Sequence, residues 1–125
     1  MKKIIDTPNA PKAVGPYSQA VDTGNMLFVS GQLGLDPATG ALVSEEVTEQ
    51  AKQVLSNVQA IVEAAGYKME NIVKATVFLA DINDFIPVNR IYKTYFTNEY
   101  PARAAYQVGS LPLGGKVEME VIAVK

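Results

Sequence analysis

The apolar residues of this chain recur with two different periods, and the order of the two kinds of segment limits its fold. Residues 45–65 and about 84–97 have the helical period, with apolar side chains on one stripe. Shorter apolar segments between turn residues predict strands, so the chain order is β-β-α-β-α-β-β. We expect a single α+β domain over residues 1–125, with one mixed sheet and both helices packed on one face. The predicted strands are Tyr17–Asp22, Met26–Gly31, Ile72–Ala80, Ala104–Val108 and Lys116–Val124.

Residues at the ends of these segments suit helix caps and turns. Ser44 is a candidate N-cap of the first helix, and Gly66 is a candidate C-cap. Asp84 can cap the second helix, which leaves Pro87 in the first turn, where proline is tolerated. Gly24-Asn25 predicts a hairpin turn between the first two strands.

The predicted strands carry apolar side chains on both faces. Two helices can cover only one face of a sheet, so the second apolar face predicts contacts with other subunits. Partial exposure in a monomer is the alternative. The alternation groups Val73 with Ala75, Val77 and Leu79 on one face, and Val117, Met119, Val121 and Ala123 opposite Glu118, Glu120, Ile122 and Val124.

Composition excludes several classes of chemistry. The chain has neither Cys nor His, which excludes disulfides, His-ligated zinc and the Ser-His-Asp triad. Acid–base chemistry therefore depends on Asp, Glu, Tyr, Lys or water, and we expect no metal. The net charge is −2 and the basic residues are scattered, which disfavours nucleic-acid binding. No stretch is apolar enough to span a membrane or to form a signal peptide, so a cytoplasmic protein is expected.

Three sets of residues are candidates for a site, and each has a simpler alternative. Arg103, at the start of a predicted strand, suits bidentate capture of a carboxylate, or is a solvated surface arginine. Glu118 and Glu120 project to one side of the last strand, either into a cleft or at a solvated strand end. Small residues around Gly15–Gln19 and Val29–Gln32 allow a ligand close to the backbone, or form a turn and a bulge.

Together these motifs resemble one family along the whole chain. The sequence is similar to the RidA (YjgF) family, the reactive intermediate deaminases. The motifs that carry the resemblance are Asn9-Ala10-Pro11, Gly15–Ala20, Ser30-Gly31-Gln32, Val73–Leu79 with Asp81, Val88-Asn89 with Tyr92, Pro101-Ala102-Arg103, Gln107-Val108, Leu111-Pro112 and Val117–Ala123.

The resemblance implies a fold, an assembly and residue roles. The family is similar in fold to the trimeric chorismate mutase, so it implies a homotrimer with sites in clefts between subunits. Arg103 would hold the substrate carboxylate, Glu118 would orient or activate the attacking water, and the backbone N–H of Ala105 would add a hydrogen bond. The remaining pocket residues implied by the resemblance are Tyr17, Ser30, Gly31 and Asn89.

The implied reaction is hydrolysis of 2-imino acids and their enamine tautomers to 2-oxo acids and ammonia, without metal or cofactor. The implied substrates are 2-iminobutanoate, 2-iminopropanoate and 2-aminoacrylate. Many members have a cysteine where this chain has Ala105, so any role of a thiol is missing here. Glu120 is the alternative to Glu118 as the main carboxylate. A non-catalytic ligand-binding or regulatory trimer, a ribonuclease and a chorismate mutase are the rival functions.

Overall fold

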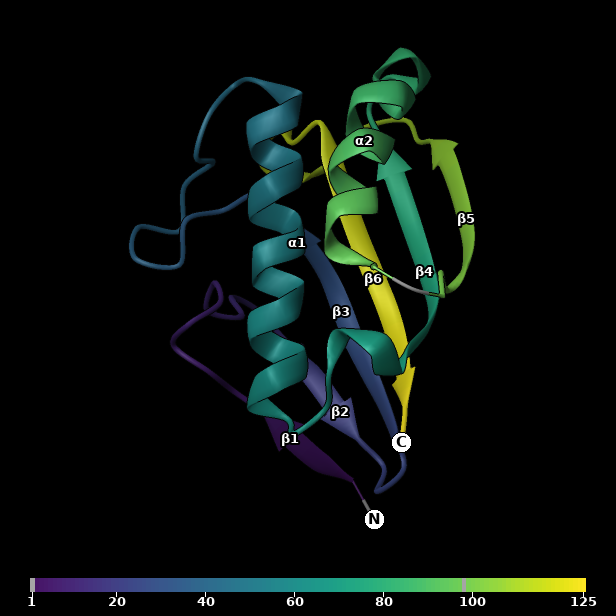
Figure 1. Ribbon diagram of the computed structural model, residues 1–125. Helices are drawn as coiled ribbons and strands as arrows, with labels where there is room; N and C mark the ends of the chain where they lie inside the picture. Colours follow the sequence, from purple (N-terminus) through teal and green to yellow (C-terminus); the bar gives the residue numbers. More distant parts are fainter. Residues whose placement is uncertain (1, 98) are drawn as a thin grey trace.

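A mixed six-stranded sheet carries both long helices on one face, as the sequence predicts (Figure 1). The computed structural model describes residues 2–97 and 99–125. The strand order is β1-β2-β3-β6-β4-β5, in which β4 and β5 are parallel and the other neighbours are antiparallel. The strands are β1 Lys3–Ile5, β2 Ala20–Asp22, β3 Met26–Leu33, β4 Ile72–Leu79, β5 Ala102–Gln107 and β6 Val117–Val124.

The core lies between the helices and one face of the sheet. Helix α1, Val47–Ala64, packs on β3 and β6, and α2, Phe85–Tyr95, lies beside α1 (Figure 1). Full burial of an aliphatic side chain stabilises a fold by roughly 1.5–3 kcal/mol, so this stripe is a main source of stability. The buried apolar residues of α1 are Ala51, Val54, Leu55, Val58, Ile61 and Val62.

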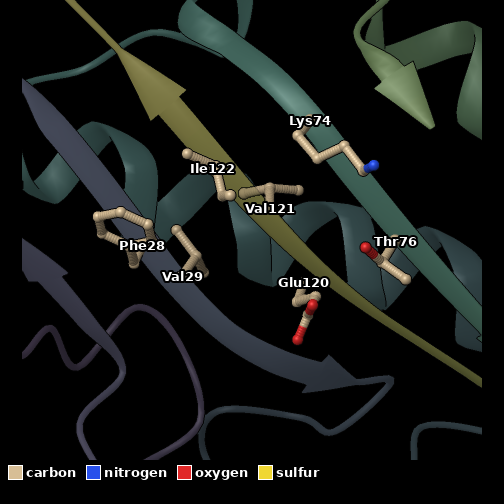
Figure 2. A pocket seen from close by; sticks show the side chains of 7 residues that line it. All are labelled: Phe28, Val29, Lys74, Thr76, Glu120, Val121 and Ile122. Carbon is tan, nitrogen blue, oxygen red and sulfur yellow. The ribbon is translucent and has the colours of Figure 1, made fainter. Parts of the chain in front are cut away.

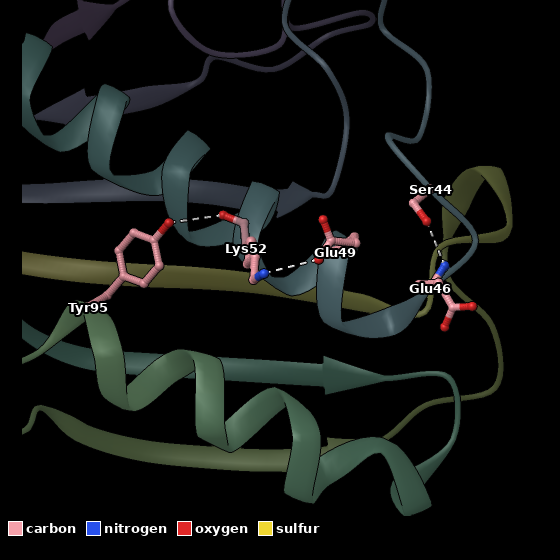
Figure 3. Close-up of polar contacts among 5 residues, drawn as sticks. All are labelled: Ser44, Glu46, Glu49, Lys52 and Tyr95. Carbon is pink, nitrogen blue, oxygen red and sulfur yellow. Dashed lines mark hydrogen bonds and ion pairs between the residues drawn. The ribbon is translucent and has the colours of Figure 1, made fainter.

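The helix ends differ in part from the predicted caps. Helix α1 begins after Glu46, and Ser44 lies two residues too early to cap it: its Oγ accepts a hydrogen bond from the Glu46 backbone N–H (3.0 Å, Figure 3). Gly66 follows the C-cap residue Ala65 with φ +82°, the left-handed conformation that glycine adopts without strain. Asp84 precedes α2 but makes no capping bond with its side chain, because a short 3₁₀ turn, Ile82–Asp84, already leads into the helix.

A polar contact joins the two helices near one end, and a second lies within α1. The Tyr95 hydroxyl of α2 donates a hydrogen bond to the Lys52 carbonyl of α1 (3.3 Å), and Lys52 Nζ also pairs with Glu49 (3.1 Å) in Figure 3. The Lys52–Glu49 pair is half-exposed on both sides, so it contributes little to stability. The helix layer is therefore held mainly by its apolar contacts with the sheet.

Two bulges change which face some side chains occupy. In β4, Ile72 pairs with Ala123 and Lys74 with Ile122, so Val73 is an extra residue and its side chain is 47% exposed. The expectation that Val73 shares the buried face is therefore wrong, because the bulge interrupts the alternation. In β3, a second register shift leaves Ser30 and Gly31 together opposite a single residue of β6, as the simpler interpretation of these residues predicts.

In the part of the chain that the structure describes, no element covers the face of the sheet away from the helices. It carries apolar and acidic side chains side by side, and Phe28 there is 42% exposed. The Phe78 and Tyr106 rings on neighbouring strands are paired, with centroids 6.0 Å apart. We refer to this surface, Phe28, Thr76, Phe78, Glu118, Glu120 and Ile122, as the open face. Among the described residues, no helix is long and apolar enough to cross a bilayer.

Candidate active site

Arg103 lies on the helix-covered side of the sheet, at its edge. It is the second residue of β5 and pairs with Ala75, whose side chain is buried under the helices. Its Nη1 donates a hydrogen bond of 2.6 Å to Oδ1 of Asn89, and its guanidinium lies over the rings of Phe85 and Tyr92 of α2. Arg103 remains exposed, so its other N–H groups are free to bind an anion. The sequence prediction that Arg103 and Asn89 line one pocket is consistent with this contact.

The backbone beside Arg103 adds a donor. The Val108 N–H donates a hydrogen bond to the Leu79 carbonyl of β4. Backbone N–H groups of successive residues in a strand point to opposite sides, and Ala105 lies three residues before Val108, so the Ala105 N–H points away from β4. Because β5 is the last strand of the sheet, that N–H faces the open edge. Arg103, Asn89 and Ala105 therefore form one group, which we call the arginine group. A hollow of about 500 Å³ adjoins it, lined by Asn89, Tyr92, Lys93, Tyr100, Pro101 and Arg103.

Glu118 lies on the open face, against Gly31. A Cβ atom added to Gly31 would lie 2.9 Å from Oε2 of Glu118, so a larger residue at this position would force the carboxylate to move. Gly31 lies in the β3 bulge, where the register between β3 and β6 shifts. Burial raises the pKa of Glu118, and the nearby charge of Glu120 raises it further. A carboxyl group with a raised pKa is better suited to accept and return a proton near neutral pH.

Tyr17 and Ser30 accompany Gly31 at this end of the sheet. The Ser30 Oγ donates a hydrogen bond of 2.5 Å to the Ser18 carbonyl, and the Ser30 N–H donates to the Gln19 carbonyl. The buried Gln19 side chain accepts from the Thr7 N–H at 2.7 Å, so the loop that carries Tyr17 is anchored on both sides. Tyr17 itself is 52% exposed. We call Glu118, Gly31 and Ser30, with Tyr17 of the anchored loop, the glutamate group.

The two groups lie far apart within one chain. Arg103 pairs with Ala75, and Glu118 pairs with Phe78 on the other side of the same strand, β4. The Cα atoms of Arg103 and Glu118 are separated by two strand spacings across the sheet and by three residues along β4, which places them about 14 Å apart. Their side chains project from opposite faces of the sheet. One chain therefore does not bring Arg103 and Glu118 to the same substrate. The sequence alone does not reveal this separation, because it depends on the order of the strands.

Glu120 occupies a different environment from Glu118. It is exposed on the open face, opposite Thr76, and lines a shallow hollow of about 170 Å³. Figure 2 shows the residues around this hollow, with Lys74 and Glu120 on neighbouring strands. Glu120 lacks the close contact with a glycine backbone that distinguishes Glu118. The geometry favours Glu118 as the residue that handles a proton.

The sequence interpretation missed the aromatic residues that surround Arg103. The helical period of residues 84–97 places Phe85 and Tyr92 on the apolar side of the second helix, and Tyr92 enters otherwise only as part of a motif of the resemblance. The signal was the spacing of Phe85, Asn89 and Tyr92 at i, i+4 and i+7, which puts all three on one helix face. Within the described ranges, no three His, Cys, Asp or Glu side chains are grouped so as to hold a metal ion.

Comparisons with known proteins cover the whole chain. A family model described as Endoribonuclease L-PSP matches residues 7–125. A Bos taurus protein named 2-iminobutanoate/2-iminopropanoate deaminase is 58% identical over 125 residues, 100% of this chain and 91% of that protein. A putative endoribonuclease structure from Thermotoga maritima has a TM-score of 0.97 at 48% identity, covering 100% of this chain and 98% of the other. Escherichia coli TdcF, solved with bound serine, has a TM-score of 0.94 at 48% identity, with 98% of each chain covered.

Proposed function

Since the chain belongs to the RidA (YjgF) family, whose model is described as Endoribonuclease L-PSP, we propose that it hydrolyses 2-imino acids and their enamine tautomers. The products are the 2-oxo acid and ammonia, and the substrates are 2-iminobutanoate, 2-iminopropanoate and 2-aminoacrylate. The observation that carries the proposal is the full-length identity, 58% and 53%, with Bos taurus and Homo sapiens proteins named for this deamination. The serine bound to TdcF has the carboxylate and short side chain of the same class of molecule.

In this proposal the arginine group binds the carboxylate of the substrate. The free N–H groups of Arg103 form two parallel hydrogen bonds with the two carboxylate oxygens. The outward N–H of Ala105 donates a further hydrogen bond, and this contribution needs no particular side chain at position 105. Binding in this way fixes the imine carbon relative to the protein, which lowers the entropic cost of reaction.

Glu118 of the glutamate group handles the proton. The water oxygen attacks the carbon of the protonated imine while the C=N electron pair moves to nitrogen, and Glu118 accepts the proton that the water loses. Glu118 returns this proton to the nitrogen of the carbinolamine. The O–H electron pair of the hydroxyl then forms the C=O bond as the C–N bond breaks, Glu118 takes the hydroxyl proton, and ammonia leaves. Glu118 finally passes this proton to the released ammonia. An enamine first takes a proton on its β-carbon and so becomes the protonated imine. The raised pKa of Glu118 supports a role in which it alternates between its two protonation states.

We propose that the protein is a homotrimer and that each active site combines the arginine group of one subunit with the glutamate group of the next. The separation of the two groups within one chain and the uncovered open face both support this arrangement. Apolar side chains on the open face would then be covered by neighbouring subunits. A cytoplasmic location stays a prediction.

A coupled assay tests the reaction. A pyridoxal-phosphate dehydratase acting on serine or threonine generates the enamine in place, and the release of ammonia is followed with and without this protein. We expect a faster release that depends on the protein concentration. An unchanged rate combined with binding of 2-oxobutanoate would favour the non-catalytic, regulatory alternative instead. Single-stranded RNA incubated with the protein is expected to remain intact, since the basic residues form no patch in the sequence.

Mixed trimers test whether the site is shared. Arg103→Ala and Glu118→Gln subunits are each expected to be inactive alone. If random reassembly of equal amounts puts an intact arginine group beside an intact glutamate group at one interface in four, mixing restores about a quarter of wild-type activity. A site contained within one chain predicts no recovery on mixing, and light scattering of the mixture reports whether trimers form.

A further inference from the structure

Tyr92 connects the core to Arg103. Its side chain is 3% exposed, and its ring packs against Phe96 with centroids 4.7 Å apart. The Cζ atom of Arg103 lies 4.7 Å from the centroid of the same ring, and 5.2 Å from that of Phe85. A cation over an aromatic face within about 6 Å is attracted by the negative charge density of the ring. Arg103 thus meets a rigid, buried ring.

We propose that Tyr92 is a positioning residue that fixes the plane of the Arg103 guanidinium, and with it the direction in which the paired N–H groups meet the substrate carboxylate. The proposal rests on the proposed function, because it assigns Tyr92 a task only if Arg103 binds a carboxylate. Tyr92 itself does not touch the substrate in this account. It acts through Arg103.

The contacts around Arg103 explain why a ring is needed. A long arginine side chain loses considerable rotamer freedom when it is fixed, and Arg103 is exposed at the edge of the sheet. Its hydrogen bond to Asn89, which involves Nη1 alone, still permits rotation of the guanidinium about this contact. The face of Tyr92 removes this freedom, because a guanidinium stacked on a ring keeps its donors directed sideways. Asn89 and Tyr92 lie on the same face of α2, so the helix presents both contacts together.

The ring of Tyr92 contacts Arg103 and Phe96, whereas its hydroxyl is buried without a partner in the part of the chain that the structure describes. Among the described residues it is the buried side-chain polar atom without a hydrogen-bond partner. Burial raises the pKa of this hydroxyl, and the positive charge of Arg103 partly offsets the effect, so it stays protonated at neutral pH. A buried hydroxyl without a partner destabilises a fold, so its removal should not weaken the protein. The substitution Tyr92→Phe therefore separates the hydroxyl from the ring.

The experiment compares Tyr92→Leu with Tyr92→Phe and with Val88→Ala as a matched control. Val88 is buried on the same helix but offers no ring to Arg103. We expect Tyr92→Leu to raise KM and the dissociation constant of 2-oxobutanoate about tenfold, within the range of a cation–π contact, with a much smaller change in kcat. Tyr92→Phe should bring both values back to within about twofold of wild type and raise Tm. Val88→Ala should lower Tm and leave KM unchanged.

Two outcomes would overturn the proposal while leaving the deaminase activity in place. If wild type turns over but Tyr92→Leu has the KM of Val88→Ala, then Tyr92 is only a core residue. If Tyr92→Phe is as impaired as Tyr92→Leu, then the hydroxyl and not the ring is responsible. Should Tyr92→Leu fail to fold, Phe85→Leu tests the other ring, with an expected rise of about threefold in KM. A wild-type protein without turnover contradicts the proposed function itself.

Discussion

The two faces of the sheet differ in composition and in burial. The covered face is apolar and complete within one chain: Leu27, Val77 and Met119 are each no more than 3% exposed beneath the helices. The open face mixes large apolar side chains with Glu118 and Glu120, and none of the residues that the structure describes covers it. The first face has the composition of a core, whereas the second has that of a surface that meets a partner and carries reactive groups. Stability and activity should therefore respond to substitutions on different faces.

The largest effect should come from Glu118→Gln on the open face. The amide cannot accept a proton from water, so we expect a loss of kcat of about a thousandfold, within the range for general acid–base catalysis. Binding of 2-oxobutanoate should persist. The rate is measured in the coupled assay, beside Glu120→Gln, which is expected to retain most of the activity. A fully active Glu118→Gln variant would transfer the role to Glu120 or remove carboxylates from the mechanism.

The same variant should gain stability. The folded-state pKa of Glu118 is raised, so its contribution to stability is present below the unfolded pKa and is lost as pH rises through the folded pKa. Glu118→Gln removes this loss, so its Tm should exceed that of wild type at pH 7 to 8 and converge with it at acid pH. Calorimetry across this range measures the difference.

A pair of substitutions on β6 compares the two faces directly. Met119→Ala opens a cavity under the helices and should cost about 3 kcal/mol of unfolding free energy. Ile122→Ala, three residues away on the open face, should cost roughly 1 kcal/mol or less in the folded subunit and instead shift the proposed trimer toward dissociation. Urea unfolding at two protein concentrations separates these effects. Equal costs at both concentrations would contradict the distinction between the faces.

The substitution Arg103→Lys tests the edge of the covered face, where we expect a loss of activity without a loss of stability. Lysine keeps the positive charge but cannot form two parallel hydrogen bonds with a carboxylate. Displacing the substrate by about an ångström can cost on the order of a hundredfold in rate, so we expect kcat/KM to fall by about that factor. Tm and molar mass should not change, because Arg103 is exposed. A variant that unfolds or dissociates would make Arg103 a structural residue.

The smallest effect concerns a polar contact outside both faces. The Tyr67 hydroxyl donates a hydrogen bond of 2.9 Å to Asp22, joining the end of α1 to the β2–β3 hairpin. Burial and this bond raise the pKa of Tyr67 to about 12. The contact stabilises the fold fully below pH 10 and is lost as pH rises toward 12. Tyr67→Phe should unfold with a weaker pH dependence in this range, as followed by circular dichroism.

The sequence predicts this fold well where a segment is long and periodic. The stripe of α1, the alternation in β6 and the turn at Gly24-Asn25 all follow from local chemistry, and the structure confirms them. Strand β1 was missed because three residues show no period. The site is less predictable. The sequence shows that Arg103 and Glu118 are present, but it does not show that their strands lie on opposite sides of β4. That arrangement depends on the parallel pairing of β4 with β5, which no local signal encodes.

The β3 bulge has a consequence for insertions and deletions. Ser30 and Gly31 together face one residue of β6, so loss of one codon here would leave a regular strand with the pairs on either side intact. Val29 would still pair with Val121 and Gln32 with Met119, and the core would keep its contacts. If Gly31 is the residue lost, the glycine that lies against Glu118 is lost with it. A three-nucleotide deletion thus separates the fold of this chain from the site that we propose beside Glu118.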